Sequence, residues 1–156
     1  MTETLTATKT LIVGLGSPYG DDQIGWMACE RLITEIGHLP AVEFIICDRS
    51  GIEWMTKLPP GGQVIFIDAM RSGEKPGTVS KIDIRSERCA ECPATLSSHG
   101  INIRDAIDLV QSLGDLPEII SVWGVELEQC NYEWGLSESV NTALPTLLEN
   151  IKSDIH

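Results

Sequence analysis

Short apolar runs alternate with amphipathic stretches along this chain, which is typical of a sheet whose strands are separated by helices. The run at 63–68 is almost wholly apolar, as expected of a central parallel strand covered on both faces. The stretch 78–84 alternates apolar and polar residues after a short loop, which predicts an antiparallel edge strand. The predicted strands are 11–13, 42–48, 63–68, 78–84 and 118–126, and the predicted helices are 22–36, 51–58, 97–113 and 137–151.

In this order the elements predict an α/β fold built as a single three-layer domain. Its sheet is expected to be mainly parallel, twisted and five-stranded, with one antiparallel edge strand and with helices on both faces. The polar segment 1–9 is predicted to be a flexible N-terminus, and 10–152 to form the domain. Pro145 lies inside the last predicted helix and should kink or restart it.

Charge and hydropathy narrow the class of protein. The formal net charge of -12 argues against a nucleic-acid partner, because binding to phosphates needs a basic face. The N-terminus has no basic segment followed by an apolar run, so no signal peptide is expected. No apolar stretch approaches the about 18 residues of a membrane span, and we expect a cytoplasmic protein with no membrane partner.

The five cysteines do not form a recognisable framework. Cys89 and Cys92 form a C-x-x-C pair, but no second pair completes a structural zinc site. The pair lies in a polar loop before Pro93, so we interpret it as reduced and incidental. Cys47, near the end of a predicted strand, is the cysteine best placed for a Cys–His nucleophile, which stays an alternative.

The stretch 11–25 places a strand, a glycine turn and a helix start in immediate succession. Gly14 and Gly16 let the backbone turn sharply, and Asp21 and Asp22 stand where a carboxylate can cap the first helical turn. It is a poor dinucleotide fingerprint, because the glycine spacing differs and two aspartates would oppose a pyrophosphate. Two interpretations stay open: helix capping alone, or ligands for a cation.

Two further residues could complete a cation site. Asp68 ends the third predicted strand and would share a sheet edge with Asp21 and Asp22 if the strands are parallel. His99 begins a predicted helix, where a lone histidine is more often a cap. Together, two carboxylates and one imidazole would form an open three-ligand site, which suits a divalent ion such as nickel, zinc or cobalt.

Four sets of residues, in order along the chain, resemble the motifs of the [NiFe]-hydrogenase maturation endopeptidases. They are GLGSPYGDDQIG at 14–25, FIDA at 66–69, SSHG at 97–100, and GVE at 124–126 with GLS at 135–137. The resemblance implies a protease that removes a short C-terminal extension from the precursor of a hydrogenase large subunit. In that family cleavage follows nickel insertion and lets the large subunit close around its metal centre.

The resemblance also implies roles for single residues. The metal-contacting acid, Asp and His of the family correspond to Asp22, Asp68 and His99, and these would be both the metal-contacting and the catalytic residues. The nickel would be carried by the substrate, where it could polarise the scissile carbonyl or activate a water. Asp21 is a further catalytic candidate, as a base or as support for one. The free protein is expected to be a monomer.

Two other functions remain alternatives. The opening LIVGLGSP is similar to the first strand and loop of peptidyl-tRNA hydrolase, but no Thr-Arg-His-Asn element follows and the charge opposes tRNA binding. A non-catalytic nickel-binding escort could use the same Asp22, Asp68 and His99. It would bind metal without changing the mass of the precursor.

Overall fold

A computed structural model describes residues 8–48, 51–84, 108, 112, 116–128 and 135–155. Five strands form one sheet in the order β2-β1-β3-β5-β4, and all neighbours are parallel except β4 and β5. The predicted mainly parallel α/β fold with an antiparallel edge strand is therefore confirmed. The strands are β1 (Thr10–Gly16), β2 (Val42–Asp48), β3 (Gln63–Met70), β4 (Val79–Asp83) and β5 (Ile119–Glu126).

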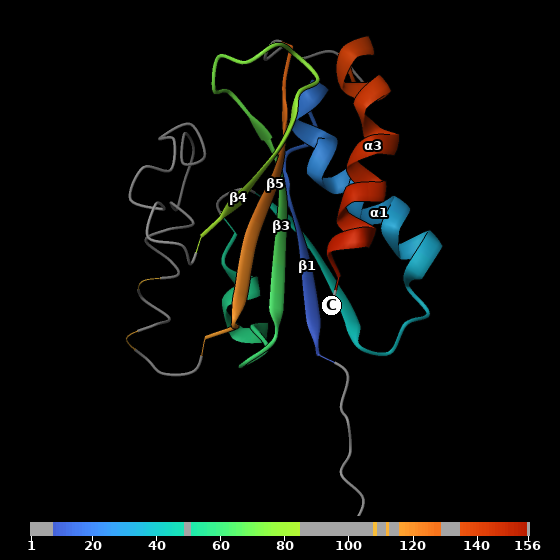
Figure 1. Ribbon diagram of the computed structural model, residues 1–156. Helices are drawn as coiled ribbons and strands as arrows, with labels where there is room; N and C mark the ends of the chain where they lie inside the picture. Colours follow the sequence, from blue (N-terminus) through green and yellow to red (C-terminus); the bar gives the residue numbers. More distant parts are fainter. Residues whose placement is uncertain are drawn as a thin grey trace, which may run out of the picture.

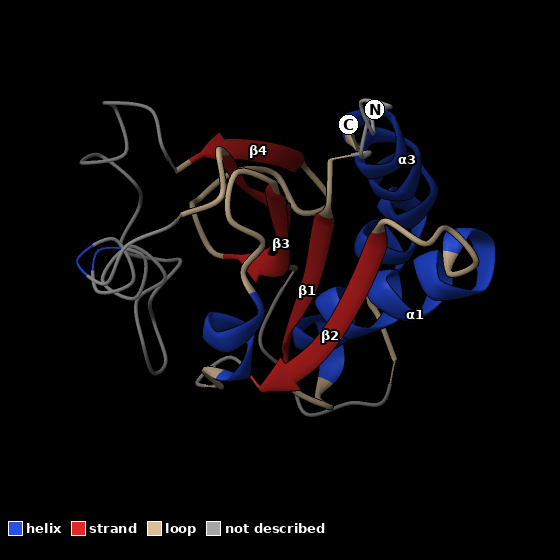
Figure 2. Ribbon diagram, turned by 90° about the horizontal axis from the view of Figure 1, so that it is seen from below, coloured by secondary structure: helices blue, strands red, loops and turns tan. Residues whose placement is uncertain are grey.

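Each face of the sheet has its own apolar core. Helices α1 (Ile24–Ile36) and α3 (Glu138–Asp154) lie together on one face, as Figures 1 and 2 show. The 3-10 helix η2 (Glu53–Lys57) covers part of the opposite face, where Trp54 meets Phe66 edge-on with ring centroids 4.9 Å apart. All of β1 and β3 is buried, which explains their nearly unbroken apolar sequences.

Three helices of the structure differ in detail from the predicted ones. The 3-10 turn η1 (Gly20–Gln23) precedes α1, and the short helix expected at 51–58 is the 3-10 helix η2. Of the kink or restart predicted at Pro145, the restart is wrong, because α3 runs through this residue, and the kink stays a prediction. Pro145 is exposed, so the Asn141 carbonyl that it leaves without an N–H also faces solvent, and the buried leucines on either side keep the helix docked.

The helix predicted at 97–113 lies outside the described residues, apart from Asp108 and Ser112, which are helical. Residues 1–7 of the predicted flexible N-terminus also lie outside them. Among the described residues, no helix combines the length and apolar character needed to cross a membrane.

Two glycines allow α1 to pack closely against the sheet. A Cβ atom on Gly25 would overlap the carbonyl oxygens of Leu15 in β1 and Ile67 in β3. A Cβ atom on Gly14 would likewise overlap the Gly25 carbonyl oxygen. The first turn of α1 can therefore lie directly against the carboxyl ends of the two central strands.

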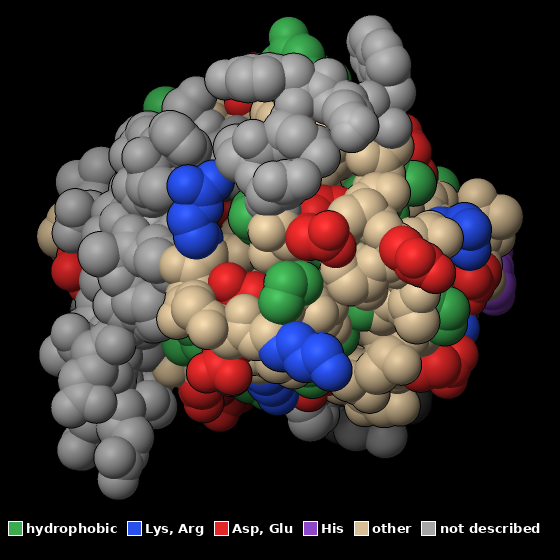
Figure 3. Space-filling view, turned by 90° about the horizontal axis from the view of Figure 1, so that it is seen from above, with side chains coloured by type: hydrophobic (Ala, Val, Ile, Leu, Met, Phe, Trp, Pro, Cys, Tyr) green, Lys and Arg blue, Asp and Glu red, His purple; other side chains and the backbone are tan. Residues whose placement is uncertain are grey.

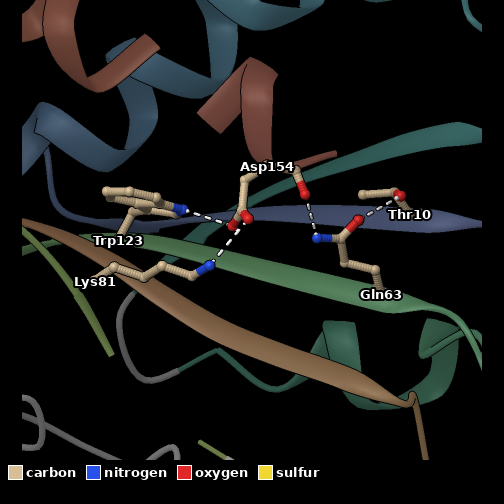
Figure 4. A network of polar contacts seen from close by, with 5 residues as sticks. All are labelled: Thr10, Gln63, Lys81, Trp123 and Asp154. Carbon is tan, nitrogen blue, oxygen red and sulfur yellow. Dashed lines mark hydrogen bonds and ion pairs between the residues drawn. The ribbon is translucent and has the colours of Figure 1, made fainter. Parts of the chain in front are cut away.

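A polar network fixes the C-terminal end of α3 near the amino ends of β1 and β3 (Figure 4). Gln63 donates to the Asp154 carbonyl oxygen at 2.7 Å and accepts from the Thr10 hydroxyl at 3.1 Å. The Asp154 carboxylate accepts from Trp123 Nε1 at 3.1 Å and pairs with Lys81 at 2.9 Å. This network provides hydrogen-bond partners for Gln63, a buried polar residue at the start of β3.

Candidate active site

The connection from β1 to α1 is a tight turn that presents Asp22. Ser17 N–H donates to the Asp22 carbonyl oxygen at 3.2 Å, and Asp22 N–H donates to the Tyr19 carbonyl oxygen at 3.0 Å. The Ser17 hydroxyl also donates to Asp22 Oδ2 at 2.6 Å, and Asp22 is half-buried. A Cβ atom on Gly16 would overlap the Asp22 carbonyl oxygen, so glycine is required for this turn. The turn thus holds the Asp22 carboxylate in a defined place beside the end of β1.

The Asp21 side chain, from the same turn, contacts the residues after β5 and before α3 and is buried, with 3% of its surface exposed. Its Oδ1 accepts from Ser137 N–H at 2.6 Å. Its Oδ2 accepts from Glu128 N–H at 2.9 Å and from the Ser137 hydroxyl at 2.8 Å. The two adjacent aspartates therefore have different surroundings, a distinction that their sequence does not reveal.

Asp68 lies near the carboxyl end of β3 and is buried, with 1% of its surface exposed. Its Oδ1 accepts from the N–H of Ala69 at 2.7 Å. Because β1 and β3 are parallel, with Gly14 paired to Ile67, Asp68 lies at the same sheet edge as Asp21 and Asp22. The structure thus brings these three carboxylate residues to one edge.

His99 lies outside the described residues. Among the residues that the structure describes, no three His, Cys, Asp or Glu side chains form a group able to hold a metal ion. Of the three predicted ligands, Asp22 and Asp68 are described and His99 is not, so the three-ligand site stays a prediction.

Glu126 also lies at this edge, and no role was predicted for it, although it belongs to one of the motifs that carry the resemblance. It is buried at the end of β5 and opposite Met70 in the sheet. Its carboxylate accepts from Ser72 N–H at 3.0 Å, from the Ser72 hydroxyl at 2.6 Å and from Gly73 N–H at 3.2 Å. It anchors the connection from β3 to β4. A glutamate at the end of an apolar strand was the available signal.

A small cleft of about 360 Å³ opens at the carboxyl end of β2. Its lining includes Trp26, Cys47, Asp48 and Glu53, and Trp26 Nε1 donates to the Cys47 carbonyl oxygen at 2.8 Å. Viewed along the strands from their carboxyl ends, this side of the molecule carries scattered acidic groups with a few Lys and Arg side chains (Figure 3). The negative cleft favours a cationic or neutral group on a partner.

Cys47 does not have the properties of a nucleophile. It is 8% exposed, and burial raises the pKa of its thiol to about 11, with further increases from the carboxylates of Glu53, Asp48 and Asp68. The thiolate is the reactive form, and almost none is present at neutral pH. Burial raises the pKa of the Cys29 thiol to about 12. The Cys–His alternative is therefore disfavoured for both described cysteines.

Comparison with known proteins finds one family. The family model HycI, hydrogenase maturation protease, matches residues 32–154. A Methanocaldococcus jannaschii protein assigned as a hydrogenase maturation protease is 29% identical over 149 residues, covering 93% of this chain and 95% of that protein.

Solved structures share the fold. The Escherichia coli hydrogenase maturating endopeptidase HybD matches with a TM-score of 0.75 and 23% identity, over 94% of this chain and 91% of its own. A [NiFe] hydrogenase maturation protease, HycI from Thermococcus kodakarensis, matches with a TM-score of 0.72 and 24% identity, over 96% of this chain and 93% of its own.

Proposed function

Because this chain belongs to the hydrogenase maturation protease family, we propose that it removes the C-terminal extension of a [NiFe]-hydrogenase large-subunit precursor once nickel has been inserted. That it is a peptidase follows from the family. The proposal also includes the hydrogenase precursor as substrate, the dependence on nickel, and action in the cytoplasm as a free monomer.

The observation that carries this proposal is the position of Asp22 and Asp68. Asp22, in the turn that follows β1, and Asp68, near the end of β3, lie at the carboxyl edge of two parallel strands, where open α/β folds place their sites. Asp22 is held by the Ser17 hydroxyl and Asp68 by the Ala69 N–H, so both carboxylates are oriented before substrate arrives.

In the proposed reaction nickel is part of the substrate. Asp22, Asp68 and His99 contact the nickel of the loaded precursor and so recognise that insertion is complete. Bound nickel supplies the Lewis acidity that polarises the scissile carbonyl or activates a water. The residues of this chain would hold the precursor so that the peptide bond before its C-terminal extension is within reach of the site.

Substitution of the three residues tests the proposal. Asp22→Ala, Asp68→Ala and His99→Ala should each abolish cleavage of a nickel-loaded precursor, while circular dichroism shows a folded protein. Glu43→Ala removes an exposed carboxylate near the start of β2, away from the site, and is the matched control, expected to retain cleavage within about threefold. Unimpaired cleavage by all three site variants would contradict the assigned roles.

The escort alternative predicts a different result. An escort would bind nickel through Asp22, Asp68 and His99 and leave the mass of the precursor unchanged. Mass spectrometry of the wild-type reaction separates the two functions. The peptidyl-tRNA hydrolase alternative loses its support, because the family match covers 32–154 and belongs to a protease.

A further inference from the structure

We propose that Asp21 is a positioning residue that fixes Asp22 to the sheet edge and transfers no proton. Its carboxylate links the turn carrying Asp22 to the end of β5 and to the start of α3. The inference rests on the proposed function, in which Asp22 contacts the nickel of the substrate, and it separates the roles of two adjacent aspartates.

Three contacts carry the inference, and all join Asp21 to residues far along the chain. Ser137 N–H donates to Oδ1 at 2.6 Å, while Glu128 N–H and the Ser137 hydroxyl donate to Oδ2 at 2.9 and 2.8 Å. Glu128 and Ser137 are 107 and 116 residues from Asp21. A single carboxylate therefore connects three elements that the sequence places far apart.

All three partners of Asp21 are hydrogen-bond donors, which match the acceptor oxygens of a carboxylate. Two are backbone N–H groups and the third is the Ser137 hydroxyl. Ser137 is also the N-cap of α3, so the negative charge lies at the positive end of that helix. With both oxygens engaged and 3% of its surface exposed, Asp21 is badly placed to take a proton from a water.

A shift of Asp21 must move Asp22, because both lie in the four-residue turn η1 (Gly20–Gln23). The turn meets the sheet closely at Gly16, where no side chain fits. Asp21 holds the turn from its other side through Glu128 and Ser137. Loss of that hold allows Asp22 to move, and small displacements of a catalytic group lower the rate strongly.

A double-mutant cycle tests the inference on the full chain with a nickel-loaded precursor. Asp21→Asn places an amide NH₂ against a backbone N–H, and Ser137→Ala removes the hydroxyl donor. We expect kcat to fall about 10- to 100-fold for Asp21→Asn and several-fold for Ser137→Ala, with KM changed by less than about threefold. The kcat of the double variant should be about equal to that of Asp21→Asn, because both substitutions disrupt the same contact between Asp21 and Ser137.

Thr142→Ala is the matched control. Thr142 lies on the exposed side of α3, so its hydroxyl can be removed without changing the contacts of Asp21. Its kcat should stay within about twofold of wild type.

Three results would overturn the inference. A dead Asp21→Asn variant beside a fully active Ser137→Ala variant would make Asp21 a base. Effects that multiply in the double variant would show independent roles. A lowered melting temperature with unchanged kcat would show a purely structural residue.

If the wild-type protein cleaves no precursor, the proposed function fails by itself. Hydrogen exchange then still tests the contact: the amides of Glu128 and Ser137 should lose protection in Asp21→Asn, and unchanged protection would refute it.

Discussion

Gly25→Ala is the substitution that most directly tests how the fold positions the site. Gly25 is buried at the second position of α1, and its missing side chain lets the helix contact β1 and β3. An added Cβ atom would overlap the carbonyl oxygens of Leu15 and Ile67. Both are backbone atoms of central strands, so the helix start must move instead, by about an ångström.

The expected magnitude combines two opposing effects. Overpacking against rigid backbone costs about 3 kcal/mol, while alanine in place of glycine in a helix gains about 1 kcal/mol. The free energy of unfolding should therefore fall by about 2 kcal/mol, and the melting temperature by about 4–8 °C for a chain of this length. Because η1 leads directly into α1, cleavage should fall about 100-fold at a temperature where the variant is fully folded.

Urea titration and precursor cleavage at 20 °C measure the two effects separately. Thr34→Ala, on the exposed side of the same helix, is the matched control and should change stability by less than about 0.5 kcal/mol. A Gly25→Ala variant with wild-type stability and activity would refute the reasoning, because it would mean that α1 is not held by this close approach.

Three further predictions concern single side chains. Cys47→Ala should cleave the precursor at a rate within about twofold of wild type. Because burial raises the pKa of the Cys47 thiol from 9.0 to about 11, the free energy of unfolding of the wild type should fall as pH rises between those values. Urea titration should show a less steep fall in the variant. An unchanged slope would contradict this. Asp154→Ala should lower the free energy of unfolding by about 1–2 kcal/mol through its lost contacts to Trp123 and Lys81, and a loss below the error of urea titration would show that the network adds nothing. Glu126→Gln should speed hydrogen exchange of the Ser72 and Gly73 amides about tenfold, and unaltered exchange would deny its anchoring role.

The strands could be predicted because their patterns are local. The apolar run of β3 indicated a buried central strand, and the alternation of β4 indicated an antiparallel edge strand. The last helix was predicted from residue 137, and Ser137 is the N-cap of α3, with a hydroxyl that accepts from Val140 N–H. The start of α1 was predicted two residues early, because the close approach of Gly16 to Asp22 tightens that segment into a 3-10 turn.

The different surroundings of the two aspartates could not be predicted. Asp21 and Asp22 are the same residue type side by side, and what separates them is that Glu128 and Ser137 approach only one of them. Those contacts exist only once β5 and α3 are in place. The same is true of Glu126, whose partners lie 53 and 54 residues away. Long-range hydrogen bonds of this kind leave no periodic pattern in the sequence.

The central claim is that this chain cleaves a hydrogenase precursor only after nickel has been inserted. The most direct measurement is the intact mass of a candidate large-subunit precursor, nickel-loaded and nickel-free side by side, after incubation with the wild-type protein. The account predicts loss of a C-terminal peptide from the loaded form alone. Equal cleavage of both forms would contradict the nickel requirement, and an unchanged mass for both would contradict processing of that precursor.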